Sequence, residues 1–218
     1  EIRLSLVGSE MCIRDRRGNA NKMMARLLYH IAEEKSYRLS EIYGGSKDNV
    51  IAMEAHASLV AAPEDTEQIL AMIRNMEDVW NAEFMGEEPG LTVKTETEKN
   101  ADTVVFSKDT TQKVVGYLKA SPNGLKEYSR KVAGATETSL NLGILELKED
   151  ALTSLTSIRS SVKTRKEDLC ARVTMLVEML GGEAEVEGDY PAWEYRTDSA
   201  LRPQVENCLL YTSPSPRD

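Results

Sequence analysis

The sequence is poor in cysteine, has no long apolar run and carries no excess of basic residues. Its 218 residues include three cysteines, an odd number that cannot form a fully paired disulfide framework. With no recognisable secretory leader, so few thiols favour a reducing, cytoplasmic location. No segment approaches the roughly eighteen consecutive apolar residues of a membrane-spanning helix. The net charge is -9 and the lysines and arginines are scattered, so we expect no nucleic-acid partner and no membrane partner.

Histidine is scarcer still, which limits the chemistry that the chain can perform. The two histidines are His30, on the flank of a predicted helix, and His56, in a predicted strand. A hydrolytic zinc site needs clustered ligands, so we assign no metal-binding residue. Cys170 has no neighbouring base in the sequence, and Gly44-Gly45 and Gly181-Gly182 lack the Lys and Ser or Thr of a phosphate-binding loop. We therefore assign no catalytic residue, and we interpret the two glycine pairs as a turn and a helix end.

Both ends of the sequence resemble translated sequencing-adapter sequence. Residues 5–16 match a transposase-type adapter, and residues 208–218 match the same adapter read from its complementary strand. A natural leader and a Ser/Pro-rich tail are the alternative interpretation, but two flanks that match one adapter in opposite orientations favour an artefact. We therefore expect residues 1–16 and 208–218 to contribute nothing essential to the fold.

Hydrophobic periodicity and capping signals predict four helices. Apolar residues recur at helical spacing over residues 24–31, which is typical of a helix with one buried face. Ser107 is placed to cap the third helix, and Thr164 with Glu167 forms a capping box for the fourth. The helices are expected over residues 21–34, from Pro63 past Trp80, from Ser107 to Ser121 and from Thr164 to Gly181.

Alternating segments between these helices predict strands, over residues 37–43, 55–62, 91–96, 138–147, 151–160 and 183–190. The short polar turn after residue 147 predicts an antiparallel hairpin with residues 151–160. Strands that are interleaved with single helices and joined by hairpins indicate an α+β fold, in which an antiparallel sheet is covered by helices. Two hairpins that are each followed by a helix also suggest a duplicated unit.

Six short segments occur in the order and at the spacing of one known family. They are Gly18-Asn19-Ala20-Asn21-Lys22, Gly44-Gly45 with Asp48-Asn49-Val50-Ile51 and Glu54-Ala55, Ser121-Pro122-Asn123-Gly124, residues 136–143, Ile158-Arg159-Ser160 and Tyr190-Pro191-Ala192-Trp193. Each segment is a weak signal alone, but together they span most of the region between the flanks. The sequence therefore resembles the cytosolic aminoacylhistidine dipeptidases, also called Xaa-His or beta-alanyl-histidine dipeptidases.

This resemblance implies that the parent protein is an enzyme, a metallodipeptidase with two zinc ions. In that family the catalytic domain is interrupted in sequence by a lid and dimerisation domain. Residues 17–190 resemble this inserted domain, and residues 191–207 resemble the start of the return to the catalytic domain. The family's zinc ligands and catalytic glutamate lie in the catalytic halves, so the resemblance implies a part that covers the dipeptide substrate, supports a homodimer and is inactive alone.

Two residues of the matching segments carry over as substrate-binding candidates. Asn49 occupies the place of the asparagine in the family's Asn-Ala-Ile-Pro segment, and Arg159 that of the arginine in its Ile-Arg-Ser segment. An amide can hydrogen-bond a substrate carbonyl, and a guanidinium can bind a peptide carboxylate through two parallel hydrogen bonds. The structural alternatives are a turn residue for Asn49 and a surface ion pair for Arg159.

The chain departs from the family pattern beside Asn49. Asp48 stands where the family usually has an arginine, and Ala52 and Met53 replace the proline and arginine that follow. The first change reverses a charge, so substrate preference at this end is open. Two other functions also stay open: the lid of a related amino-acid deacylase or carboxypeptidase, and a non-catalytic α+β binding or dimerisation module.

Overall fold

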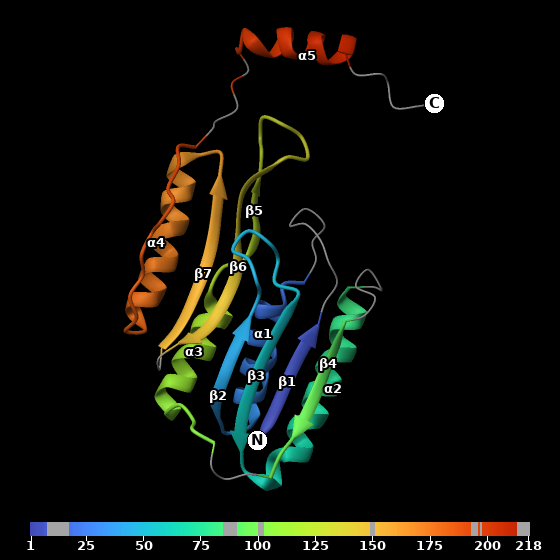
Figure 1. The fold of residues 1–218 in the computed structure, drawn as a ribbon, viewed down its shortest axis with the longest axis vertical. Coiled ribbons are helices and arrows are strands. Elements are labelled where there is room, and N and C mark those ends of the chain that lie inside the picture. Colours follow the sequence, from blue (N-terminus) through green and yellow to red (C-terminus); the bar gives the residue numbers. More distant parts are fainter. Residues whose placement is uncertain are drawn as a thin grey trace.

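The computed structural model describes residues 1–7, 18–84, 91–99, 103–148, 151–192, 196 and 198–212. Its strands form one antiparallel sheet with helices packed on it, which confirms the α+β architecture (Figure 1). The strands are β1 (Ile2–Val7), β2 (Tyr37–Gly44), β3 (Glu54–Ala61), β4 (Thr92–Thr97), β5 (Gly124–Tyr128), β6 (Thr136–Lys148) and β7 (Ala151–Ser160). The helices are α1 (Ala20–Glu34), α2 (Thr66–Glu83), α3 (Lys108–Ala120), α4 (Lys163–Met179) and α5 (Leu201–Thr212), with a 3-10 turn at Pro63–Asp65.

The first unit of the fold comprises β1 to β4 with α1 and α2. Its strands lie in the order β4-β1-β3-β2, and all neighbours are antiparallel. α1 packs on β1, β2 and β3, and α2 packs on α1 and β4. The apolar stripe predicted for α1 is buried, and so is the α2 stripe at Ile69, Ile73, Met76 and Trp80.

The second unit comprises α3, β5, β6, β7 and α4. β6 pairs with β7 from Thr138 to Lys148 along one edge. Its other edge pairs first with β5 over Thr136 to Leu140 and then with β2 at Leu145. The two units thus share one sheet across β2 and β6, and α1 and α3 pack together over this join.

Two capping signals read from the sequence agree with the helix ends in the structure, and one does not. The Ser107 hydroxyl accepts a hydrogen bond from the Thr110 amide at 3.0 Å, which confirms it as the cap of α3. Gly181 has a φ of +83° at the end of α4 and donates to the Glu178 carbonyl, as a helix end requires. The capping box at Thr164 is wrong, because α4 begins one residue earlier, at Lys163, with no side-chain cap.

The expectation that residues 1–16 contribute nothing to the fold is wrong for Ile2–Val7. This segment is β1, and it pairs along its whole length with β3 on one side and β4 on the other. Ile2, Leu4 and Leu6 are buried under the helices. Three apolar residues at every second position form the inner face of a strand, so the domain begins before residue 17.

Other parts of the chain also differ from the predictions. Residues 183–190 form no strand; they run beside α4, where the Lys166 amine donates to the Asp189 carboxylate at 2.5 Å and to the Tyr190 carbonyl at 2.6 Å. β5 and α5 were not predicted, and α5 extends into the flank that begins at residue 208. Residues 8–16 and 213–218 of the flanks and Trp193 of the last motif lie outside the described residues. No described helix is both long and apolar enough to span a bilayer.

Candidate functional site

Four asparagines from distant segments meet where the two units join. Asn19 precedes α1, Asn21 lies in its first turn, Asn123 precedes β5 and Asn141 lies in β6. The Asn19 amide nitrogen donates to the Asn141 side-chain oxygen at 3.0 Å, and it lies 3.5 Å from the Asn123 side-chain oxygen. Asn19, Asn21 and Asn141 are buried. We call these four residues the asparagine junction.

The asparagine junction fills a gap between two strands. β5 leaves β6 after Leu140 and β2 meets it only at Leu145, so Leu142 and Gly143 have no strand neighbour on that edge. The Asn123 oxygen accepts from the Leu142 amide at 2.9 Å. The amide nitrogens of Asn19 and Asn21 donate to the Leu142 carbonyl at 3.0 and 3.2 Å. Side-chain amides therefore satisfy buried backbone groups that would otherwise be costly to bury.

Glycines let the backbones approach closely beside the asparagine junction. A Cβ on Gly44 would lie 2.2 Å from the Asn21 oxygen, and one on Gly45 would lie 1.7 Å from the Gly143 carbonyl oxygen. Gly45 also has a φ of +72°, a conformation that other residues rarely adopt. A Cβ on Gly143 would lie 2.6 Å from the Asp48 carbonyl oxygen. The glycine pair predicted as a turn is therefore also a contact between the two units.

Lys22 joins the units a second time. Its amine donates to the carbonyls of Leu118, Lys119 and Ser121 at the end of α3, with 2.7 Å to Ser121 and 3.1 Å to Lys119. A cation at this end of a helix is favoured by the helix dipole. Burial, followed by the charges of Lys119 and Lys126, lowers the pKa of Lys22 to about 8.

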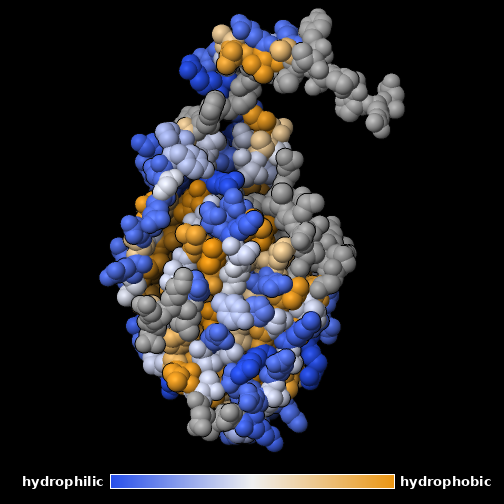
Figure 2. Space-filling view, viewed as in Figure 1, coloured by the Kyte–Doolittle hydropathy of each residue, from blue (hydrophilic) through white to orange (hydrophobic). Residues whose placement is uncertain are grey.

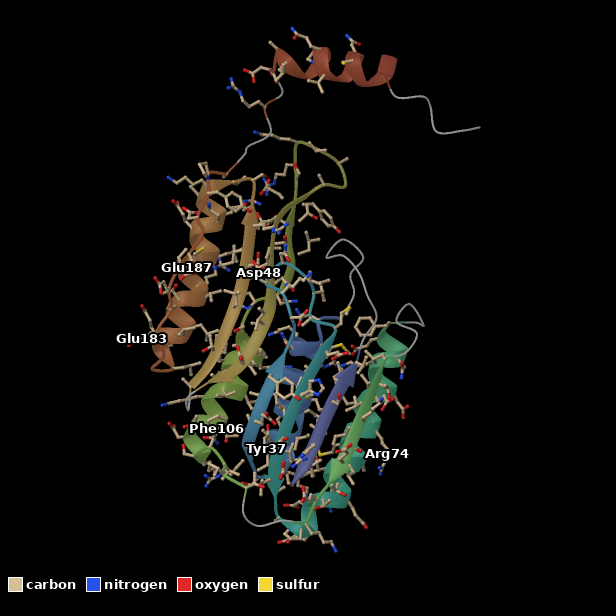
Figure 3. All side chains as sticks on the ribbon, viewed as in Figure 1. Tyr37, Asp48, Arg74, Phe106, Glu183 and Glu187 are labelled. Carbon is tan, nitrogen blue, oxygen red and sulfur yellow. The ribbon has the colours of Figure 1, made fainter. Side chains whose placement is uncertain are left out.

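The loop after β2 presents Asn49 to solvent while its backbone is held. The Asn141 amide nitrogen donates to the carbonyls of Asp48 at 3.1 Å and Val50 at 2.7 Å, on either side of Asn49. Asn49 itself is exposed in a turn, and its side chain makes no hydrogen bond with another described residue. Figure 3 shows Asp48 in this loop, beside the strands of the second unit.

Arg159 lies on the same face of β6 and β7 as Asn141. In the ladder, Asn141 is opposite Ser157 and Ser139 is opposite Arg159, and opposed residues share a face. The Ser154 hydroxyl, on the alternate face, lies 2.6 Å from the Tyr117 hydroxyl of α3, so Arg159 points away from α3. We call the face that carries Asn141 and Arg159 the open face. Arg159 is exposed on it and forms no hydrogen bond or ion pair with the described residues.

Neither histidine lies at the asparagine junction. The His30 ring is 3.7 Å from the Glu33 carboxylate one turn along α1, and the His56 ring stacks on Tyr43 with 4.6 Å between ring centres. Burial raises the pKa of the Cys170 thiol. Within the described ranges, no cluster of three or more His, Cys, Asp or Glu side chains could hold a metal ion.

The four asparagines belong to the matching segments, but the sequence alone assigned them no role. A signal was present, because two of the six matching segments contain asparagines that prove to be buried, Asn19 and Asn21 in one and Asn141 in the other. A buried amide needs several hydrogen bonds, and within one strand or helix it cannot find them. Such residues therefore indicate a contact between segments that are distant in sequence.

Comparison with known proteins finds similarity to parts of known peptidases. The family model described as a peptidase dimerisation domain (M20_dimer) matches residues 13–87. The chain is 29% identical over 186 residues to the cytosol non-specific dipeptidase of Escherichia coli (strain K12), a match that covers 84% of this chain and 38% of that protein.

A solved structure is similar over nearly the whole chain. The aminoacylhistidine dipeptidase from Vibrio alginolyticus matches with a TM-score of 0.86 and 28% identity, covering 98% of this chain and 44% of that one. This chain thus spans less than half the length of both relatives. Nothing in the comparisons supports an adapter origin of the flanks, and the family match begins at residue 13, inside the first of them.

Proposed function

We propose, from the premise that this chain carries an M20 peptidase dimerisation domain of the aminoacylhistidine dipeptidase type, that it is the lid of a zinc-dependent dipeptidase. In this proposal Asn49 and Arg159 contact the dipeptide substrate from the open face. The cytoplasm is the expected location of the parent enzyme, as for the relative whose name includes cytosol.

One observation supports the proposal most directly: the two candidate residues come together on one face. The loop that carries Asn49 is bonded to Asn141, and Arg159 is the diagonal neighbour of Asn141 in the ladder. Diagonal neighbours in antiparallel strands are about 7–8 Å apart. This spacing joins Asn141 to Arg159, so the loop held by Asn141 lies near Arg159. In the proposal, the exposed Asn49 amide binds a carbonyl and the exposed Arg159 guanidinium binds the carboxylate of one short peptide.

Arg159 offers the sharpest test, made in the full-length parent enzyme. Loss of a hydrogen-bonded charged partner is worth roughly 1.5–3 kcal/mol, so Arg159→Ala should lower kcat/KM by about tenfold to a hundredfold. Arg159→Lys keeps the charge but loses the two-pronged geometry, so its loss should be smaller than that of Ala. The matching C-terminal amides should be nearly insensitive to either change. An equal loss for free acids and amides would contradict carboxylate binding.

The metal requirement belongs to the parent enzyme in this proposal. Its two zinc ions would activate the attacking water, and their ligands would come from outside the residues of this domain. The 218-residue chain alone should therefore bind no stoichiometric zinc and cleave no Xaa-His dipeptide. Elemental analysis of the purified chain and a hydrolysis assay test both points, and zinc-dependent cleavage would overturn the assignment.

The alternative functions predict different outcomes in the same parent enzyme. A lid of an amino-acid deacylase or carboxypeptidase would give activity on N-acyl amino acids or longer peptides rather than on Xaa-His dipeptides. A non-catalytic module would give no activity on any of them. Asp48 stands where the family usually has a cation, so a panel that varies the charge of the first substrate residue would show whether preference has changed.

We also propose that this domain forms the homodimer contact of the parent enzyme through the edge of β7. Among the described strands β7 pairs only with β6, and Leu155 in its middle is 47% exposed. Arg159 is the only charged residue in Ala151–Ser160, and the strand has no proline, so nothing in it opposes pairing with a second antiparallel copy. Sedimentation across a concentration series measures the association, and a chain that stays monomeric at high concentration would contradict it.

A further inference from the structure

The loop of residues 46–50 has little internal structure of its own. It follows β2 at Gly45, whose amide donates to the Glu54 carbonyl at 3.0 Å, and it re-enters the fold near Ala52. Residues 46–50 are exposed, and residues 48–50 form only a turn and bend. Contacts made outside the loop must therefore decide the position of Asn49.

The loop packs against Gly143, and Asn141 adds hydrogen bonds with both hydrogens of its amide. They go to the Asp48 carbonyl at 3.1 Å and the Val50 carbonyl at 2.7 Å, one on each side of Asn49. An exposed turn can instead hydrogen-bond to water, so the fold does not need these two bonds for its own stability. Their effect is to hold the turn at one place on the open face.

The orientation of the Asn141 amide is set from its other end. Its oxygen accepts from the Asn19 amide nitrogen at 3.0 Å, so its nitrogen has to face the loop. Asn19 is itself held, because its oxygen accepts from the Lys22 amide at 3.2 Å as the cap of α1. A chain of hydrogen bonds therefore runs from the start of α1 through Asn141 to the loop.

We propose that Asn141 is a positioning residue, which holds the turn of residues 48–50 so that Asn49 is presented beside Arg159 on the open face. The inference rests on the proposed function for its link to substrate, but the holding of the loop can be tested in this chain alone. Asn141 touches no substrate in this proposal and acts only through Asn49.

Two isosteric substitutions separate this role from a general role in the asparagine junction. Asn141→Asp keeps the oxygen that accepts from Asn19 but replaces both donated hydrogen bonds by repulsion from two carbonyls. Asn123→Asp keeps the hydrogen bonds that Asn123 makes with other described residues, because its oxygen accepts from Leu142 and lies near Asn19. The two variants thus carry the same chemical change and differ in whether a donor to the loop is lost.

The experiment measures backbone order of residues 48–50 by NMR relaxation in the 218-residue chain. The order parameter should be about 0.85 in the parent sequence and in Asn123→Asp, and should fall below about 0.6 in Asn141→Asp. Asn141→Ala, which buries no charge, should give the same fall if the Asp variant does not fold. Dispersed amide signals from β1 to β3 report folding. An ordered loop in the folded Ala variant would overturn the inference.

The link to substrate is tested separately by a double-mutant cycle in the full-length enzyme. Asn49→Ala and Asn141→Ala should each lower kcat/KM by about tenfold, mainly through KM, and the double variant should be no worse than Asn49→Ala. Additive losses would show that Asn141 acts through something other than Asn49 and would overturn the inference. If Asn49→Ala has no effect while the loop still loosens without Asn141, the proposed function fails and the holding role stands.

Discussion

The two units contain similar elements, but they differ in how many neighbours their hairpin strands have and in how much of their helices is buried. In the first unit, the hairpin strand β3 has a neighbour on each side, β2 and β1. In the second unit, β7 occupies the corresponding place after β6, and the described part of the chain gives it a neighbour on one side only. The difference shows in the helices: α2 buries four side chains, whereas Leu169 is the only buried residue of α4.

The helix that follows each hairpin differs in how much of its apolar surface is buried. α2 packs on β4, beyond the hairpin, and its apolar stripe is covered. α4 packs on β7, and Met175 and Met179 on its surface are 56% and 77% exposed. Figure 2 shows hydrophobic residues gathered on this side of the molecule among hydrophilic ones. The second unit is therefore the part that a partner, such as a second copy, can complete.

Removing β1 should have the largest effect, because it would leave the first unit as incomplete as the second. Deletion of residues 1–7 removes a central strand and three buried side chains, each worth about 2–5 kcal/mol. We expect a chain that is unfolded or molten at 25 °C by near-ultraviolet circular dichroism and thermal melting. Deletion of residues 193–218 is the control and should leave the melting curve nearly unchanged. Equal effects of the two deletions would contradict the central place of β1.

Matched substitutions in α2 and α4 should give the next largest difference. Ile73→Ala removes a fully covered side chain and should lower the free energy of unfolding by about 2–5 kcal/mol. Leu176→Ala, at a partly covered position of α4, should lower it by about 1 kcal/mol, because less surface is returned to water. Urea denaturation measures both. Similar losses would mean that α4 is packed as completely as α2.

Lys22, whose hydrogen bonds join the two units, should make the free energy of unfolding depend on pH. This effect should be smaller than the two above. The pKa of Lys22 is about 8 in the fold against 10.5 unfolded, so between these values the unfolded chain binds the extra proton and stability rises with pH. Partial exposure reduces the gain to on the order of 1 kcal/mol. The difference in stability between the parent chain and Lys22→Met should change by this amount from pH 7 to pH 9.5. A constant difference would contradict a lowered pKa.

Leu155→Lys should have the smallest effect on stability and a selective effect on association. Leu155 is half exposed, so we expect less than about 0.5 kcal/mol in the free energy of unfolding. A charge in the middle of the β7 edge should weaken self-association at least tenfold in sedimentation experiments. Thr95→Lys on β4, the opposite edge of the sheet, is the matched control. Weaker association in the control alone would place the dimer contact at β4.

Local sequence patterns were sufficient to predict the helices and strands that are specified by residues close together in the sequence. The four predicted helices and the strands of both hairpins are present, because apolar period and capping act over a few residues. The α5 helix and β5 were missed because their sequences carry little periodicity. The strand expected at residues 183–190 is absent, because this segment runs beside α4, where Lys166 binds Asp189 and the Tyr190 carbonyl, and does not reach the edge of the sheet.

For the candidate site, the matching segments were enough to name the candidate residues, Asn49 and Arg159. The fold was needed to show that the loop of Asn49 is bound to Asn141 on the face of Arg159, that four asparagines close the gap along β6, and that Ile2–Val7 lies inside the sheet. The physical reason is that hydrogen bonds of buried amides and strand pairing join residues more than fifty or a hundred positions apart, and no local pattern specifies which distant partner will satisfy them.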